Sequence, residues 1–221
     1  MPTEPERCCF DEWAGSYARR ARRRRLVGPS RDLLAGLSEV GLRDRTVLDV
    51  GCSAGVLAFE TLEGGASRVT GIDLSPAAIQ EAGRIAGERG LADRATFQVA
   101  DGASAPLVPH DVVVLDKVFC CYPNVDRLLA NSLGAARALY AFSLPPSDGL
   151  RGALQRAFSA VANRWYRLRR RTFGDFRTYV HDVAALEARV REAGFEHRFG
   201  RRRLGWDLAI YVRPESTVSE R

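Results

Sequence analysis

The stretch that decides the fold is Thr46-Val-Leu-Asp-Val-Gly-Cys-Ser-Ala-Gly55, in which an apolar segment runs into a glycine-bracketed turn. The apolar residues up to Val50 predict a short strand that is covered on both faces. Gly51 permits a sharp turn where a side chain would obstruct, and Gly55 lets the following helix approach the strand closely. Such a turn forms a shelf on which a nucleoside-bearing ligand can lie against bare main chain.

Two further predicted strands end on acidic residues. Arg68-Val-Thr-Gly-Ile-Asp73 closes on a carboxylate roughly 20 residues beyond the first strand, the position from which an acid binds a ribose diol. A third strand ends at Asp101, within Phe97-Gln-Val-Ala-Asp-Gly102. Strand ends of this kind place their polar residues along one crevice. The sequence therefore predicts a cofactor site.

The glycine turn has three competing interpretations. A nicotinamide-dinucleotide fingerprint requires Gly-x-Gly-x-x-Gly, but Ser53 and Val56 replace its second and third glycines. Gly51-Cys-Ser53-Ala-Gly55 matches the Gly-x-Ser-x-Gly nucleophile elbow of hydrolases, yet that elbow follows several strands, whereas helical or loop patterning precedes this one. A shelf for the sulfonium nucleoside S-adenosylmethionine accepts Asp49 and both glycines as they stand, and we favour it.

Three motifs resemble the cofactor motifs of class I S-adenosylmethionine-dependent methyltransferases: Asp49-Val-Gly51-Cys-Ser-Ala-Gly55, Gly71-Ile-Asp73-Leu-Ser and Val99-Ala-Asp101-Gly. The resemblance spans about residues 45–145, and Ser53 stands where the loop usually has its middle glycine. It implies that Asp49 and Gly51 lie by the methionine moiety, that Asp73 holds the ribose hydroxyls and that Asp101 faces the adenine amino group. The expected cofactor-binding residues are Asp49, Gly51, Cys52, Ser53, Gly55, Asp73, Leu74, Asp101, Gly102 and Asp116.

Within this class, three stretches are most similar to magnesium-protoporphyrin O-methyltransferases: Phe10-Asp-Glu-Trp13-Ala-Gly-Ser-Tyr17, the segment from His110 to Pro123, and Arg177-Thr-Tyr-Val-His181. The resemblance implies an amino-terminal helical lid that carries a substrate-side tyrosine. Cys121 stands where that family has a loop histidine, and Lys117 replaces an aspartate of the loop, so the acceptor stays open. The residues expected to touch the acceptor are Tyr17, Cys121, Tyr122 and His181.

Three of these four residues also have a structural interpretation. Tyr17 can pack in the lid, Cys121 and its neighbour Cys120 can be buried thiols at a strand end, and His181 can serve the helix that starts beside it.

Composition limits the remaining possibilities. The chain of 221 residues is long enough for one doubly wound domain, and no apolar run approaches the roughly 20 residues of a membrane span. A polar amino terminus without a signal-peptide core leads us to expect a cytoplasmic protein. The five cysteines form no Cys-x-x-Cys pair, so neither a zinc site nor a disulfide framework is expected, and we expect no metal.

The net charge of +6 comes almost wholly from arginine, because Lys117 is the only lysine. The arginines gather at 19–25, 164–171 and 201–203. Charge runs usually face water, which we favour over a surface for an anionic partner.

Alternating strand and helix signals predict an α/β fold with a doubly wound, mostly parallel seven-stranded sheet that ends in an antiparallel hairpin strand. Residues 1–44 are assigned to an amino-terminal helical lid segment, with residues 1–7 disordered, and residues 45–213 to the methyltransferase domain. A helical insertion at about 147–175 follows strand five, and residues 214–221 form a flexible tail. Expected strands are 46–50, 68–73, 95–99, 111–116, 138–143, 195–203 and 206–213, and expected helices include 9–25, one capped by Ser30, 54–64, one capped by Ser75, 124–137 and 182–193.

In the insertion, apolar residues from Leu150 to Leu168 recur at intervals of three and four and predict one helical stripe. We favour two roles for this helix: a lid over the substrate, formed together with residues 9–25, or a surface for a partner. An interfacial membrane helix is less favoured.

The leading hypothesis is an S-adenosylmethionine-dependent O-methyltransferase acting on a small, apolar, anionic molecule. A nucleic-acid methyltransferase is the first alternative, although Asp116-Lys-Val-Phe-Cys-Cys-Tyr fits neither the Asn/Asp-Pro-Pro-aromatic turn of base-amino methylation nor the Pro-Cys of base-carbon methylation. A cofactor-binding interaction protein without turnover is the second. The sequence predicts no oligomeric state.

Overall fold

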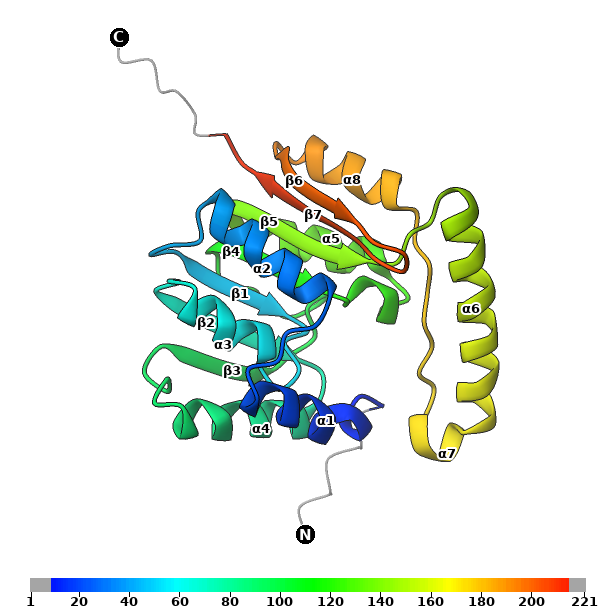
Figure 1. Ribbon diagram of the computed structural model, residues 1–221, viewed down its shortest axis with the longest axis horizontal. Coiled ribbons are helices and arrows are strands. Elements are labelled where there is room, and N and C mark those ends of the chain that lie inside the picture. Colours follow the sequence, from blue (N-terminus) through cyan, green and yellow to red (C-terminus); the bar gives the residue numbers. More distant parts are fainter. Residues whose placement is uncertain (1–8, 215–221) are drawn as a thin grey trace.

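The structure, a computed structural model, describes residues 9–214. The disorder expected for residues 1–7 and nearly all of the tail expected at 214–221 lie outside the described residues. One seven-stranded sheet forms the centre of the described chain, in the order β3-β2-β1-β4-β5-β7-β6 (Figure 1). The strands are β1 (Thr46–Val50), β2 (Arg68–Asp73), β3 (Ala95–Val99), β4 (His110–Asp116), β5 (Ala136–Leu144), β6 (Glu196–Arg202) and β7 (Asp207–Val212).

The strand directions confirm the predicted sheet. The strands from β1 to β5 are parallel to their neighbours, whereas β7 runs antiparallel to both β5 and β6. The chain winds outwards from β1 to β3 and then restarts at β4, on the other side of β1. Ligands of open α/β sheets bind outside the carboxyl ends of the strands at such a reversal, so the fold itself places a crevice between β1 and β4.

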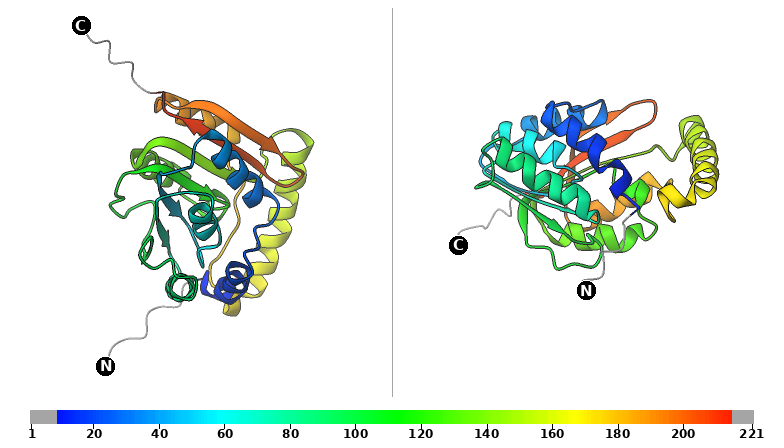
Figure 2. Two further views of the ribbon diagram at one scale, coloured as in Figure 1. Left: turned by 60° about the vertical axis from the view of Figure 1, so that its left-hand side comes forward. Right: turned by 90° about the horizontal axis from the view of Figure 1, so that it is seen from below.

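Helices cover both faces of this sheet (Figures 1 and 2). Residues of α2, α3 and α4 belong to the hydrophobic core on one face, and residues of α5 and α8 to the core on the other. The helices are α1 (Asp11–Arg22), α2 (Pro29–Val40), α3 (Val56–Glu63), α4 (Pro76–Glu88), α5 (Val125–Gly134), α6 (Gly149–Leu168), α7 (Arg170–Phe173) and α8 (Val183–Glu192). A single 3₁₀ turn, η1 (Phe119–Cys121), follows β4.

The alternation of side chains along each strand explains why both faces are apolar. Val112 and Val114 of β4 point into the first core, and Val113 and Leu115 into the second. All four are fully buried. Period-two alternation with no polar face is the pattern of a strand that helices cover on both sides.

One predicted helix start was wrong. α2 begins at Pro29, with Gly28 in the cap position, and the Ser30 side chain caps nothing. Its hydroxyl donates instead to Asp116 at the end of β4, 2.5 Å away. Ser75 does cap α4 as expected, because its Oγ accepts a backbone N–H of the first turn.

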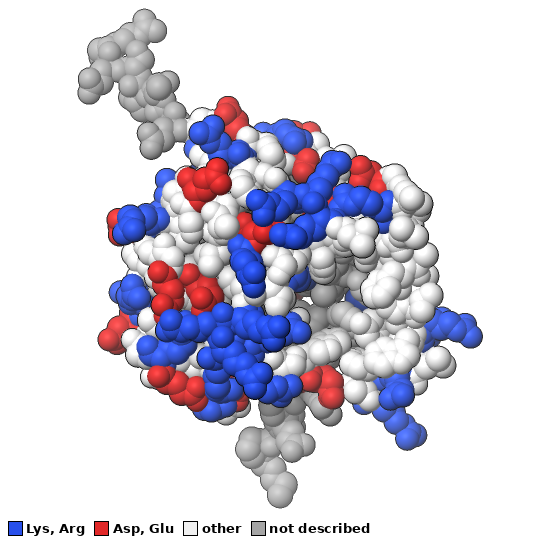
Figure 3. Space-filling view, viewed as in Figure 1, with Lys and Arg blue, Asp and Glu red and all other residues white. Residues whose placement is uncertain are grey.

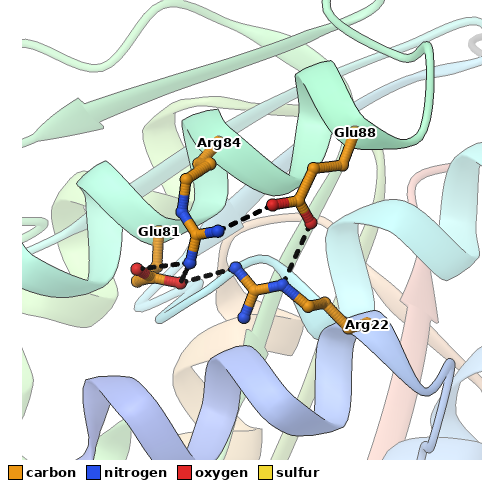
Figure 4. A network of polar contacts seen from close by, with 4 residues as sticks. All are labelled: Arg22, Glu81, Arg84 and Glu88. Atoms are coloured by element: carbon orange, nitrogen blue, oxygen red, sulfur yellow. Dashed lines mark hydrogen bonds and ion pairs between the residues drawn. The ribbon is translucent and has the colours of Figure 1, made fainter.

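The helix α1 is fastened to α4 by a network of charged side chains (Figure 4). Arg22 of α1 binds Glu81 at 2.8 Å and Glu88 at 3.0 Å, and Arg84 of α4 binds the same two carboxylates. A single exposed ion pair contributes little, but shared partners hold one another in place. A second tie joins the Ser75 hydroxyl to the carboxylate of Asp11. The network therefore fixes α1 against the domain.

A pair of glycines tests how α2 packs on the sheet. A methyl group at Gly36 would lie 2.6 Å from the Phe199 ring and 2.7 Å from Ile210, whereas one at Gly83 would meet nothing within 4 Å. We expect Gly36→Ala to lower the free energy of unfolding by about 1–3 kcal/mol through overpacking. Gly83→Ala, in the exposed middle of α4, should raise it by roughly 0.5–1 kcal/mol. Urea unfolding of both variants measures the difference, and equal effects would contradict this packing.

Candidate functional site

The turn after β1 has the geometry that its glycines predicted. Gly51 has a φ of +75°, and a Cβ there would lie 2.5 Å from a methyl group of Val118. The N–H groups of Gly51 and Cys52 both donate to the carbonyl of Ile72, which joins the turn to the end of β2. Ser53 has a φ of +50°, a conformation in which glycine is the least strained residue.

Asp73 holds this turn from the end of β2. The Ser53 N–H donates to its Oδ2 at 2.8 Å, and the Ser75 N–H donates to its Oδ1 at 2.9 Å. Burial nevertheless raises the pKa of Asp73 above its ordinary value, with the two backbone donors opposing the shift. The carboxyl group is therefore fixed in place, with its lone pairs only partly used.

Asp101 lies beyond the end of β3, and three groups hold it. Its Oδ1 accepts from the Ala103 N–H at 2.9 Å and from the Tyr122 hydroxyl at 2.8 Å, and its Oδ2 accepts from Ser104. Burial raises the pKa, but these bonds outweigh it and lower the pKa of Asp101 below its usual range. Burial and the bond to Asp101 raise the pKa of Tyr122 to about 12.

Asp116, at the end of β4, bridges two elements. Ser30 donates to its Oδ2 and Ser143 of β5 donates to its Oδ1, both at 2.5 Å. The ammonium of Lys117 lies 3.7 Å from Oδ2 and donates to the Ser30 hydroxyl at 2.6 Å. Both oxygens of Asp116 are thus occupied by protein groups, and a cation stands beside them.

Asp49 is different from the other acids. It is 2% exposed, and its Oδ2 has no hydrogen-bond partner among the described residues. Burial, reinforced by the nearby charges of Asp116 and Asp73, raises the pKa of Asp49 to about 8. The most buried acid of the site is therefore an unsatisfied carboxyl group that is mostly uncharged at neutral pH.

These acids line one cavity of about 380 Å³, a volume within the range of small-molecule sites. Its opposite wall is an aromatic roof, which we define as Phe10 and Trp13 before and on α1, Tyr166 on α6, and Phe173 and Phe176 on and after α7. Ring centroids are 4.9 Å apart for Trp13 and Phe176 and for Tyr166 and Phe176. Every member except Phe173 lines the cavity. The helices that carry the roof, α1, α6 and α7, lie beyond the carboxyl ends of the strands (Figure 1).

Most of the predicted residues meet in this cavity. Those that line it are Tyr17, Asp49, Gly51, Cys52, Ser53, Asp73, Leu74, Asp101, Gly102, Asp116, Cys121 and Tyr122. Cys121 lies on η1 with its sulfur 3.7 Å from that of Cys120, and this contact lowers the pKa of the Cys121 thiol although burial opposes the shift. Burial raises the pKa of Tyr17, whose ring lies 5.3 Å from the Arg20 guanidinium.

Two predicted residues lie outside the cavity. Gly55 serves packing, because a Cβ there would lie 2.8 Å from the Phe59 ring. His181 is not brought to the site, since its Nε2 is shared by the carbonyls of Phe119 and Tyr122 at 3.0 Å. It anchors the loop after β4, whereas the structural role that the sequence left open, at the start of the following helix, belongs to Asp182.

Sequence reasoning missed several lining residues. Arg20 and Ser30 come from the first two helices and Arg25 from the segment between them, whereas Tyr166 and Phe176 come from the insertion and the segment after it. Tyr166 falls outside the apolar stripe that marks its helix, and Phe176 lies in an irregular segment without periodicity. The aromatic content of 166–176 was the available signal.

Comparison with known proteins agrees with this geometry. Residues 43–142 match a family model described as a methyltransferase domain. The magnesium protoporphyrin IX methyltransferase from Synechocystis PCC 6803, solved with bound SAH, has a TM-score of 0.68 at 19% identity over 92% of this chain and 97% of that chain. The chain has the class I methyltransferase fold, and its residues 43–142 are similar to the methyltransferase-domain family. This result confirms the expected fold, and the match to the family model agrees with the expected methyltransferase class.

Other similarities show how far the comparison reaches. The cyclase SpnF has a TM-score of 0.68 at 17% identity over 93% of both chains. Ribosomal protein L11 methyltransferase from Pasteurella multocida (strain Pm70) is 40% identical over 81 residues, which are 37% of this chain and 27% of that protein. The chain thus spans about a quarter of the length of these curated relatives.

The glycine turn makes a prediction about stability. Gly51→Ala would combine a positive φ with a methyl group 2.5 Å from Val118, so we expect a loss of about 1–3 kcal/mol of unfolding free energy. Ser53→Gly, two residues away, relaxes a positive φ and should stay within about 1 kcal/mol of the parent protein. Thermal unfolding separates the two variants, and a Gly51→Ala protein as stable as the parent would contradict the turn.

Proposed function

We propose that this protein transfers a methyl group from S-adenosylmethionine to an oxygen of a small, apolar molecule that carries negative charge. The observation that supports the proposal is the single cavity in which strand-end acids face an aromatic roof and three cationic side chains. One part of the space suits a nucleoside with a positive sulfur, and the other suits an apolar anion.

The residues present fit the cofactor in three respects. The orphaned Oδ2 of Asp49 offers a buried acceptor to a positively charged group. Gly51 and Gly102 leave bare main chain, and a Cβ at Gly102 would lie 2.6 Å from Val50. Asp73 and Asp101 would hold the ribose and the adenine, and Leu74 would cover the base.

The acceptor side of the cavity is apolar and positively charged. Arg20 and Arg25 line it from α1 and the segment after it, and Lys117 lines it from the loop after β4. The Lys117 ammonium lies 5.6 Å from the Trp206 ring. Aromatic rings would bind a flat apolar body, and the cations would bind its negative group.

The cofactor supplies a methyl group on a sulfonium, whose departure as a neutral thioether makes an in-line displacement favourable. The chain's own residues have to align the acceptor oxygen and exclude water. The aromatic roof would do the second. A carboxylate acceptor needs no general base, and Tyr122, with its raised pKa and its bond to Asp101, stays protonated as a positioning residue.

The alternatives find less support in the cavity. A nucleic-acid or protein acceptor would need an open groove beside the cofactor, whereas here rings from two helical segments pack together along one wall of the cavity. The similarity to L11 methyltransferase covers 37% of this chain. A binding protein without turnover has the same cofactor side, so the methyl-transfer assay is what separates it from an enzyme.

Two measurements test the function. Native mass spectrometry of the purified protein should show co-purified cofactor or its demethylated product. Labelled S-adenosylmethionine should then methylate members of a panel of aromatic carboxylates, but not their methyl esters. Isothermal titration that shows no affinity for the cofactor would reject the proposal, and binding without transfer to any member would reject this acceptor class.

The ribose assignment predicts a specific loss. Asp73→Ala removes the carboxylate at the end of β2, so we expect cofactor affinity to fall by about 1–3 kcal/mol, the size of a lost charged hydrogen bond. Asp93 is an exposed acid two residues before the start of β3, at the other edge of the sheet. Asp93→Ala serves as the control and should bind the cofactor normally. Isothermal titration measures both, and an unchanged affinity in Asp73→Ala would show that the assignment is wrong.

Asp49 predicts a dependence on pH. Because its pKa is about 8 in the free protein, a cationic cofactor that favours the ionised form should release a proton on binding near pH 7. The affinity should rise by on the order of tenfold from pH 7 to 9 as the free carboxyl ionises. Asp49→Asn, measured over the same pH range, should show neither effect.

The raised pKa of Asp49 also predicts how the stability of the protein depends on pH in the absence of any ligand. A carboxyl group with a raised pKa binds more protons in the folded state than in the unfolded state, so stability falls as pH rises from about 4 towards 8. Asp49→Asn should remove that part of the slope. If the unfolding free energy of Asp49→Asn, measured in urea, depends on pH in the same way as that of the parent protein, the raised pKa is wrong.

A further inference from the structure

The helix α6 turns its apolar stripe towards solvent. Leu150, Leu154, Phe158, Val161, Trp165 and Leu168 recur at intervals of three and four, and each is between 45% and 76% exposed. None of them lines the cavity. Figure 3 shows a largely uncharged surface over this helix, and Figure 2 shows the helix standing at one side of the molecule. The stripe is therefore not the inner surface of a lid.

Polar contacts outside the stripe fix this orientation, with Arg151 beside the stripe and Asn163 opposite it. Arg151 forms an ion pair at 2.5 Å with Asp207, the first residue of β7. The amide of Asn163 donates to the Thr178 carbonyl and accepts from the Thr178 N–H, both at 2.8 Å. Tyr166 of the same helix reaches the aromatic roof. Because its polar side faces the protein, the helix holds its apolar side outwards.

Within residues 149–174, all charged side chains beside the stripe are cationic. Residues 149–174 contain no acidic residue and seven arginines, Arg151, Arg156, Arg164, Arg167, Arg169, Arg170 and Arg171. Arg164, Arg167 and Arg171 are exposed, and in the described part of the chain they form no ion pair. At 100° per residue, Arg164 and Arg169 flank the stripe on either side.

We propose that α6 docks this protein onto an anionic lipid surface. The stripe would enter the boundary between headgroups and acyl chains, while the flanking arginines would bind the anionic headgroups. A helix that presents apolar and cationic side chains together, without acids, suits this surface on both counts. In the described residues no helix is long and apolar enough to cross a membrane, so the helix would lie in the interface plane.

Charge also argues against a second copy of the chain as the occupant. Two symmetry-related α6 helices, packed stripe to stripe, would bring two sets of uncompensated arginines together. The sequence alone favoured a lid or a partner surface, because periodicity reveals a stripe but not the direction in which it faces.

Vesicle flotation tests the proposal directly. The parent protein should bind vesicles of phosphatidylglycerol and phosphatidylcholine in equal parts, bind vesicles of phosphatidylcholine far less, and dissociate as salt is raised. The double variant Leu154→Ser with Phe158→Ser should lose roughly tenfold or more of this binding, since two large apolar side chains leave the interface. The control, Ala153→Ser with Ala160→Ser, changes exposed residues on the arginine side of the helix and should bind like the parent.

Each contrary result overturns the proposal. The proposed docking onto lipid is wrong if the parent fails to bind anionic vesicles, or if the stripe variant and its control bind them equally. If the parent is a dimer in sedimentation, and the stripe variant is a monomer without any change in vesicle binding, the stripe is an interface between copies. The assay needs no turnover, so it is independent of the proposed reaction, and matching thermal unfolding confirms that both variants are folded.

Discussion

Four carboxyl groups meet at one edge of the sheet, and the site is organised around holding them together without mutual repulsion. Backbone N–H groups hold Asp73, hydroxyl groups bridge Asp116 to neighbouring elements, and donors of both kinds hold Asp101. Asp49 has no such partner for its Oδ2, and its raised pKa keeps this carboxyl group mostly protonated and uncharged at neutral pH. A site of this composition favours a positively charged ligand, because a cation beside Asp49 would favour its ionised form at neutral pH.

Much of the sheet and of this edge could be predicted because both depend on local sequence. The three strands 46–50, 68–73 and 95–99 have the predicted bounds: Gly51 follows the first, Asp73 ends the second, and Asp101 lies two residues beyond the third. The acids follow from their positions at strand ends. A parallel sheet then brings those ends together whatever the details of packing, so a pattern within each segment was sufficient.

The roof and the stripe could not be predicted in the same way. Ser30 satisfies the local rules for a helix cap, but a contact with Asp116, 86 residues away, determines its role. Tyr166 and Phe176 become neighbours of Trp13 only through the tertiary fold. The outward direction of the α6 stripe depends on Asn163 and Arg151 contacting residues that follow the helix in the chain.

The strand-end floor of the cavity and its ceiling, the aromatic roof, come from different parts of the chain. The strand ends lie within residues 43–142, and the roof joins one segment before this range to another after it. The two can therefore diverge separately. A chimaera that keeps the floor and exchanges both ceiling segments would retain donor recognition while changing which molecule is modified, and exchange of one segment alone would break the interlocking rings on which the enclosure depends.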